Sequence, residues 1–203
     1  LGRLYLDLGL ADDARPLMEQ ALATRRQALG DDHPDTMASL NDLAHALQDA
    51  GRYADAERCL REALERKRRV LGDDDPRTIV SMGSLGELLM TLGRFPEAEP
   101  LLQEALGRAR RVLGDDGPGT LVALNNLASL LKDQGRSADA EPMFREVLER
   151  RRRVLGDGHR LTIDSMSNLA WILGEQGRLD QAEPLRREAL ARSRRSEEHT
   201  SEL

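Results

Sequence analysis

The sequence predicts an all-α fold, a right-handed α-solenoid of stacked antiparallel helix pairs. The main observation is a strict repeat, because the dipeptide Leu-Gly recurs every 42 residues, at 29–30, 71–72, 113–114 and 155–156. A second glycine keeps the same period, at Gly9, Gly51, Gly93, Gly135 and Gly177. Periods of about 20–50 residues are typical of arrays whose units bury their apolar faces only against their neighbours. The composition agrees, since 2% aromatic and 33% charged residues favour helices over sheets.

The first helix of the unit is clearest in residues 34–51. Pro34 suits the first position of a helix, where its missing N–H costs no hydrogen bond. Leu40, Leu43 and Leu47 follow at the spacing of one apolar helix face. Gly51 is predicted to end this helix in the left-handed conformation.

The second helix of the unit is predicted from about residue 54 to residue 70. Its apolar face includes Leu60 and Leu64, and Gly72 is predicted to close it. The acidic turn 73–75 then leads to the next pair of helices.

Small residues recur where the two helices of a pair cross. Ala44 and Ala56 are predicted to let the backbones approach closely, where a larger side chain would force them apart. The equivalents of Ala44 in the later repeats are Gly86, Ala128 and Ala170.

Four prolines recur just past the predicted first turn of the second helices. Proline there removes one backbone hydrogen bond, so a loosened or slightly kinked first turn is expected. The four are Pro16, Pro100, Pro142 and Pro184, and the sequence assigns them no role.

The order Leu40-x2-Leu43-Ala44-x2-Leu47, then Ala56-x3-Leu60, resembles the tetratricopeptide signature. The unit has 42 residues in place of the usual number of about 34, and the terminal proline is absent. With LNNLA at 124–128 and LGDDHPDT at 29–36, the variant is similar to the kinesin light chain type of this repeat. The resemblance implies a tetratricopeptide-like superhelix over residues 1–195 and a role in protein–protein interaction. Long arrays of this kind are also similar to those appended to bacterial signalling proteins, such as kinases and regulatory ATPases.

The chain is predicted to hold one array over residues 1–195, about five helix pairs with the first one truncated. This corresponds to nine whole helices and the end of a tenth. Residues 196–203 depart from the repeat, with Glu197-Glu198 where Leu-Gly is expected, and resemble a translated sequencing adapter. We expect them to be a non-native or disordered tail of a fragment cut at both ends.

The charge and composition exclude several classes of partner. A net charge of −6 gives no basic field that would attract nucleic acid or an anionic membrane. The sequence contains no run of 18 apolar residues, so no membrane-spanning helix is predicted. Arginine runs such as 151–153 precede aspartates, so solvated ion pairing is favoured over a binding patch. Cys59, the single cysteine, is predicted to be a small core residue and not a reactive thiol. A cytoplasmic location is expected, although a chain that begins at Leu1 cannot be judged for a signal peptide.

No catalytic motif is found in the sequence. It has no zinc-binding His-Glu-x-x-His, no paired cysteines, no phosphate-binding glycine loop and no nucleophile elbow. His33 and His159 fall in predicted turns and are interpreted as ordinary polar residues. The sequence therefore predicts no enzyme, catalytic residue, metal site or cofactor.

The resemblance also indicates where a ligand would bind, because first helices line the concave face of tetratricopeptide arrays. Transferred to this chain, the candidate peptide-binding residues are Asn41, His45, Gln48, Glu87, Asn125, Ser129, Lys132 and Trp171. Asparagine can both donate to and accept from the backbone of an extended peptide. A solvated polar face is an equally good interpretation of each residue taken singly. Trp171 either anchors a peptide or packs against a missing repeat.

The sequence thus favours a scaffold that binds an extended, basic segment of a partner protein in its concave groove. The alternative is a passive spacer or self-association arm of a larger bacterial signalling protein. Cutting a solenoid exposes the apolar faces of its end units, so end-to-end self-association of the fragment is also expected.

Overall fold

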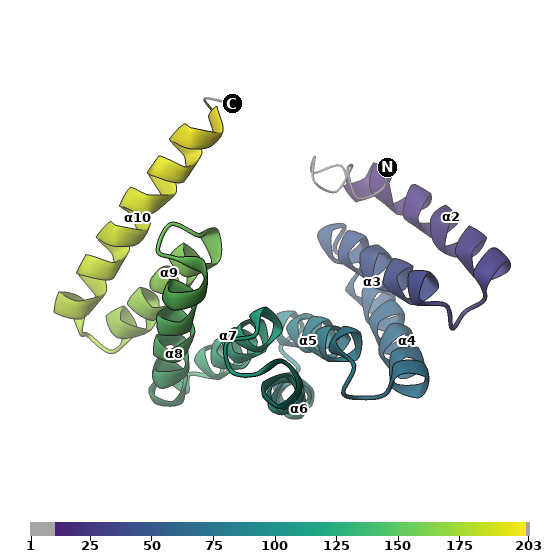
Figure 1. Ribbon diagram of the computed structural model, residues 1–203, viewed down its shortest axis with the longest axis horizontal. Helices are drawn as coiled ribbons and strands as arrows, with labels where there is room; N and C mark the ends of the chain where they lie inside the picture. Colours follow the sequence, from purple (N-terminus) through teal and green to yellow (C-terminus); the bar gives the residue numbers. More distant parts are fainter. Residues whose placement is uncertain (1–10, 202–203) are drawn as a thin grey trace. The chain divides into compact units, whose positions relative to one another are not determined.

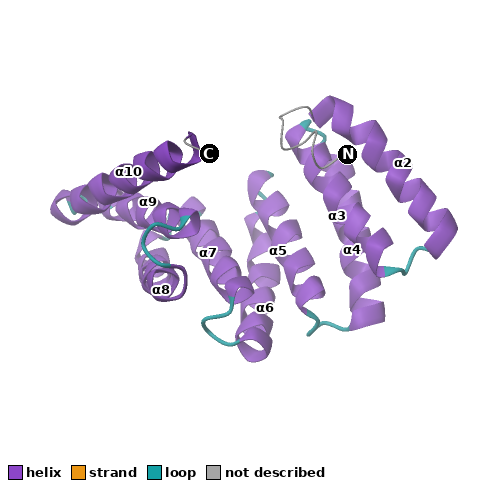
Figure 2. Ribbon diagram, turned by 45° about the horizontal axis from the view of Figure 1, so that its top comes forward, coloured by secondary structure: helices purple, strands orange, loops and turns teal. Residues whose placement is uncertain are grey.

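The computed structural model describes the backbone of residues 11–201 and the side chains of residues 16–195. Over residues 11–201 it contains nine α-helices and no β-strand, which confirms the all-α prediction (Figure 1, Figure 2). The predicted end of an earlier helix falls on residues 1–10, outside the described residues. In chain order the helices are α2 (Ala11–Leu29), α3 (Pro34–Asp49), α4 (Tyr53–Leu71), α5 (Pro76–Thr91), α6 (Phe95–Leu113), α7 (Pro118–Asp133), α8 (Ser137–Leu155), α9 (Arg160–Glu175) and α10 (Leu179–Ser201).

The helices fall into two compact units, residues 1–108 and residues 109–203. In the first unit α2 packs on α3, α3 on α4 and α4 on α5. In the second unit α7 packs on α8, α8 on α9 and α9 on α10. Within each unit consecutive helices run as antiparallel hairpins, as predicted (Figure 2).

Helix boundaries follow local signals in the chain. Helix α3 begins at Pro34, as predicted, and α4 extends one residue further at each end than the predicted range 54–70. Gly51 and Gly72 have φ values of +71° and +83°, so both take the conformation that only glycine adopts without strain.

The two turn histidines have a role that the sequence interpretation missed. The ring Nδ1 of His33 accepts a hydrogen bond from the backbone N–H of Asp35 at 3.2 Å, and His159 accepts one from the N–H of Leu161 at 3.2 Å. Each histidine therefore caps the N-terminus of a first helix, which satisfies one otherwise unpaired backbone donor.

The core follows the repeat. Leucines at the predicted core position are 2–6% exposed in the four described first helices, at Leu43, Leu85, Leu127 and Leu169. Ala44 and Ala56 are fully buried, as expected for residues at the closest helix contact. At Gly86 the approach is closer still, since a Cβ atom there would lie 2.4 Å from Cδ2 of Leu102. The close approach that the small residues predict is confirmed at Gly86, and the burial of Ala44 and Ala56 agrees with it.

Cys59 corrects one prediction, because its side chain is half-buried and does not lie in the core. Its position is at the edge of the apolar face of the second helix, where the equivalent Leu17 is 37% exposed. Partial burial raises the pKa of the Cys59 thiol, and the nearby Glu62 carboxylate adds to this. The thiol is therefore held in its protonated, less nucleophilic form.

The recurrent prolines lie inside second helices, as their spacing predicted. The helices α2, α6, α8 and α10 continue past them, and α4 carries Arg58 at the same position. The backbone of α10 is helical to Ser201, six residues beyond the predicted end of the array at 195. The side chains of residues 196–203 lie outside the described residues, so the boundary at 195 stays a prediction.

Candidate functional site

In the first unit, the polar side chains predicted to bind a ligand lie on α3 and α5. His45 and Glu87 are exposed, whereas Asn41 and Gln48 are half-buried. The Nδ2 atom of Asn41 on α3 donates a hydrogen bond to Oγ of Ser81 on α5 at 3.2 Å. This bond joins two first helices of neighbouring repeats, and it orients the Asn41 amide.

Beneath Asn41, the Lys67 ammonium of α4 is buried. Its side chain is 5% exposed, and its Nζ donates to the same Ser81 Oγ at 2.7 Å. Burial lowers the pKa of Lys67 to about 8, with a further lowering from the charge of Arg77 and opposing effects of Asp75 and Asp42. Neither Lys67 nor Ser81 was recognised as part of this surface from the sequence.

In the second unit, Asn125 on α7 is paired with an asparagine of the next first helix. The Nδ2 atom of Asn168 on α9 donates to Oδ1 of Asn125 at 3.2 Å. Asn168 was not among the predicted site residues. It occupies the same place in its repeat as Asn126, directly after the predicted position, and that recurrence is the signal that could have identified it.

Trp171 and Lys132, both predicted site residues, contact each other across α7 and α9. The Lys132 Nζ lies 5.1 Å from the centre of the Trp171 ring, a cation–π geometry. The same Nζ forms an ion pair with Asp133 at 3.2 Å. The Trp171 side chain is 43% exposed. Ser129, which lies between Asn125 and Lys132 in the sequence of α7, is half-buried.

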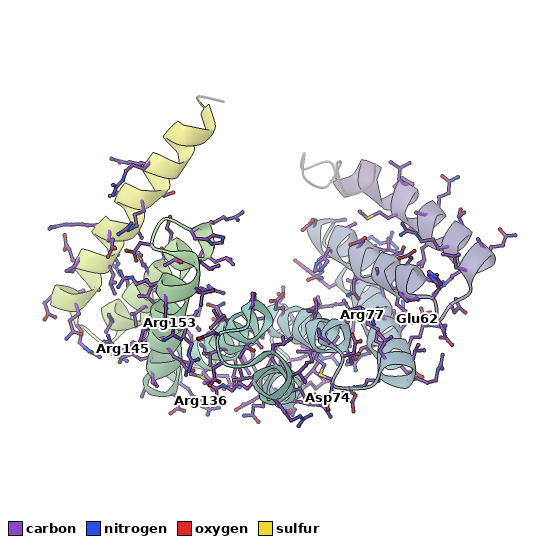
Figure 3. All side chains as sticks on the ribbon, viewed as in Figure 1. Glu62, Asp74, Arg77, Arg136, Arg145 and Arg153 are labelled. Atoms are coloured by element: carbon purple, nitrogen blue, oxygen red, sulfur yellow. The ribbon has the colours of Figure 1, made fainter. Side chains whose placement is uncertain are left out.

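The second helices carry a different surface, whose charged side chains are drawn in Figure 3 and form many ion pairs. Near the end of each of four second helices, one arginine forms an ion pair with a glutamate 36 residues later, at 2.5–2.9 Å. The pairs are Arg26–Glu62, Arg68–Glu104, Arg110–Glu146 and Arg152–Glu188. A second arginine reaches back to the preceding acidic turn, as in Arg108–Asp74 at 2.7 Å. Exposed pairs of this kind neutralise one another, which confirms the predicted solvated pairing for these arginines.

The arginine run 151–153 is only partly explained by solvated pairing. The Arg151 side chain is 4% exposed, and its Nη1 donates to Ser165 Oγ at 2.8 Å and to the Leu161 carbonyl oxygen at 3.0 Å. Burial lowers the pKa of the Arg151 guanidinium. The interpretation of the whole run as solvated was therefore wrong for Arg151, because its neighbour on the chain faces solvent while it faces α9.

Among the residues that the structure describes, no group of three or more His, Cys, Asp or Glu side chains is arranged to hold a metal ion. Within the same part of the chain, no helix is both long enough and apolar enough to cross a bilayer.

Comparison with known families and structures matches the repeat pattern. A family model described as a tetratricopeptide repeat matches residues 1–69, 37–110, 80–152 and 123–195. The comparison with curated protein sequences found no match.

Similar folds occur among solved structures. A variant of a kinesin light chain with nearly identical TPR-like repeats, from Podosopora anserina, is 23% identical, with a TM-score of 0.79 over 97% of this chain and 93% of that one. BtubC from P. vanneervenii is 22% identical, with a TM-score of 0.80 over 97% of this chain and 78% of that one. A Rap protein complexed with competence and sporulation factor is 14% identical, with a TM-score of 0.80 over 95% of this chain and 52% of that one. These likenesses concern the fold, and they confirm the α-solenoid of stacked helix pairs.

Proposed function

We propose that this chain, which belongs to the tetratricopeptide repeat family, binds an extended segment of a partner protein along its first helices. Repeat scaffolds of this family generally mediate protein–protein interaction, and their fold is typically not enzymatic. The similar Rap protein is itself complexed with a factor, which supports a binding role for the fold.

The observation that carries the proposal is the paired amides of Asn125 and Asn168. Their hydrogen bond uses the carbonyl oxygen of Asn125 and one amide hydrogen of Asn168. The amide hydrogens of Asn125 and the carbonyl oxygen of Asn168 are then left to meet a ligand. An extended backbone offers one donor and one acceptor per residue, so two asparagines held by each other match it at low entropic cost.

The neighbouring Trp171 supports the same surface. Tryptophan is enriched among residues that dominate binding energy, because a large rigid ring buries much area at little entropic cost. Here the ring is 43% exposed and lies within reach of the Lys132 ammonium at 5.1 Å. A ligand side chain placed on this ring would displace water from an already ordered pair.

The charges of the first helices favour a basic ligand. Asp49 on α3, a first helix of the first unit, carries an exposed carboxylate. Glu175 carries another on α9, the first helix of the second unit that also holds Asn168. Complementary charge raises the rate of association and selects among partners more than it raises affinity.

The test is binding of an array of extended peptides, some basic and some acidic, to the full chain and its variants. Asn125→Ala and Trp171→Ala are each expected to weaken binding of a basic peptide about 10-fold or more, because each removes about 1.4 kcal/mol or more of contact. Arg152→Ala, on a second helix, is the matched control and is expected to leave binding unchanged.

Two results would contradict the proposal. Loss of binding in Arg152→Ala, with the first-helix variants unaffected, would place the ligand on the second helices. Binding of no peptide at all would favour the alternative of a passive spacer in a larger signalling protein.

A further inference from the structure

One leucine of the second helices is buried in every earlier repeat and exposed in the last. The residue is 4–6% exposed at Leu22, Leu64, Leu106 and Leu148, and Leu190 on α10 is 55% exposed. In α2, α4 and α8 this face packs on the following first helix, α3, α5 and α9 respectively. The face of α10 around Leu190 is therefore an apolar surface of a kind that the chain otherwise covers with a helix.

A hollow of about 430 Å³ lies beside Leu190, between α9 and α10. Ile163 and Trp171 line it from α9, and both are at least partly exposed. The earlier equivalents of Ile163 are 0–4% exposed, at Met37, Ile79 and Leu121. The hollow thus continues the apolar surface from α10 onto α9.

Two charged side chains, Arg186 and Asp164, also line this hollow. Arg186 replaces a buried apolar residue, since Met18, Leu60, Leu102 and Phe144 hold its position in the earlier repeats and are 0–7% exposed. Gly174 provides the space for it, because a Cβ atom there would lie 2.6 Å from Nη2 of Arg186. The last repeat therefore has an exposed guanidinium at a position where the earlier repeats have a buried apolar side chain.

The two charges do not pair with each other. Within the described part of the chain, neither Arg186 nor Asp164 forms a hydrogen bond or an ion pair, and Asp164 acts only at longer range on the buried Arg151. The arginines that form the ion pairs of the second helices, by contrast, each reach a carboxylate. The hollow therefore combines an apolar centre with one unpaired cation and one unpaired anion.

We propose that this face binds a second copy of the chain in a two-fold dimer. A two-fold axis brings the same patch of both subunits together, so a residue i that contacts j is matched by j contacting i. Arg186 would then pair with Asp164 of the partner subunit, twice in each dimer, while the Leu190 side chains cover the apolar centre. The charge complementarity of the patch with itself favours a second copy over an unrelated partner. The inference does not rest on the proposed peptide binding, because Arg186, Asp164 and Leu190 are not among the predicted peptide contacts. Trp171 belongs to both surfaces, so a peptide on its ring and a second copy of the chain would compete for it.

Sedimentation of the full chain over a series of concentrations tests the proposal. Arg186→Asp and Asp164→Arg each place like charges together, so each is expected to weaken the dimer about 10-fold or more. An equimolar mixture of these two variants restores both pairs and is expected to dimerise as well as the parent. The double variant, with the charges exchanged, is expected to do the same. Arg187→Asp, one residue away on another face of α10, is the matched control.

Trp171 is the only tryptophan in the sequence and gives an independent readout. Its emission is expected to shift to shorter wavelength as the dimer forms, because the partner removes water from its ring. Far-UV circular dichroism shows whether each variant keeps the helical fold.

Three outcomes would overturn the proposal. One is a parent chain that stays monomeric up to about 1 mM, which is weaker than specific dimers require. Another is a dimer that both single variants leave unchanged, since association would then use another face. The third is growth beyond the dimer with concentration, which would indicate head-to-tail association of unlike ends.

Discussion

The Lys67 ammonium of α4 lies 2.7 Å from the Ser81 hydroxyl of α5, in the interior of the first unit. The two residues are 14 positions apart, and the same spacing joins Arg25 to Ser39 and Arg151 to Ser165. In the third repeat the equivalent positions hold Ala109 and Ala123, both buried. A cation and a serine therefore occur together or are both replaced by alanine. Lys67 and Arg151 are buried, whereas Arg25 in the first described repeat is exposed. For the two buried cations, the pattern is expected if the serine is there to satisfy the cation.

Stability should depend on pH through Lys67. Its pKa of about 8 lies below the ordinary value of 10.5, so the folded state releases this proton more readily than the unfolded state. The free energy of unfolding should be lowest below pH 8 and should rise between pH 8 and pH 10.5, by up to about 3 kcal/mol. Urea unfolding at pH 7.5 and pH 10 measures this change. A Lys67→Met variant should lack it, and an equal rise in that variant would assign the effect to other groups.

Removing only the serine should be worse than removing the pair. Ser81→Ala leaves the Lys67 ammonium buried without its hydrogen-bond acceptor, and a cost of about 1–3 kcal/mol in unfolding free energy is expected. Adding Lys67→Met should recover most of this loss, because two apolar side chains need no hydrogen bond. Urea midpoints of the single and double variants give the comparison. A double variant that is less stable than Ser81→Ala would show that the ammonium makes other stabilising contacts.

The closest helix contact should not accept a larger side chain. Ala44 is fully buried, so Ala44→Leu is expected to destabilise the chain by about 1–3 kcal/mol through overpacking. His45→Leu also places a leucine on α3, at the next residue, which is exposed, and it should be nearly neutral. Equal urea midpoints for the parent and Ala44→Leu would mean that the pair of helices can move apart freely.

The ion pairs of the second helices should contribute little to stability. Arg68 and Glu104 are 2.8 Å apart, with side chains 38% and 33% exposed. A double-mutant cycle to alanine should give a coupling of about 0.2–1 kcal/mol that falls in about 1 M salt. A coupling above about 2 kcal/mol that salt does not change would show that the pair is shielded from water.

The sequence by itself determined the helices and their core. Pro34, Gly51 and Gly72 act on the backbone within a turn of their own position, so their effect could be read without knowing the neighbours. The spacing of Leu40, Leu43 and Leu47 likewise places them on one face of one helix. The predicted first-helix positions of the candidate site also follow from the repeat, because a 42-residue period carries each face to the next unit.

Only the tertiary structure decided which polar groups meet. Arg151 and Arg152 are adjacent in the sequence, yet Arg151 is buried against Ser165 and Arg152 reaches Glu188 near the surface. Asn125 finds its partner 43 residues away in Asn168. Each of these contacts depends on a helix contributed by another repeat. The period of the sequence shows on which face of its helix a residue lies, but not which side chain of the next repeat packs against it. Burial and hydrogen bonding are therefore settled by the packing of repeats, because that packing removes water from one side of each helix and not from the other.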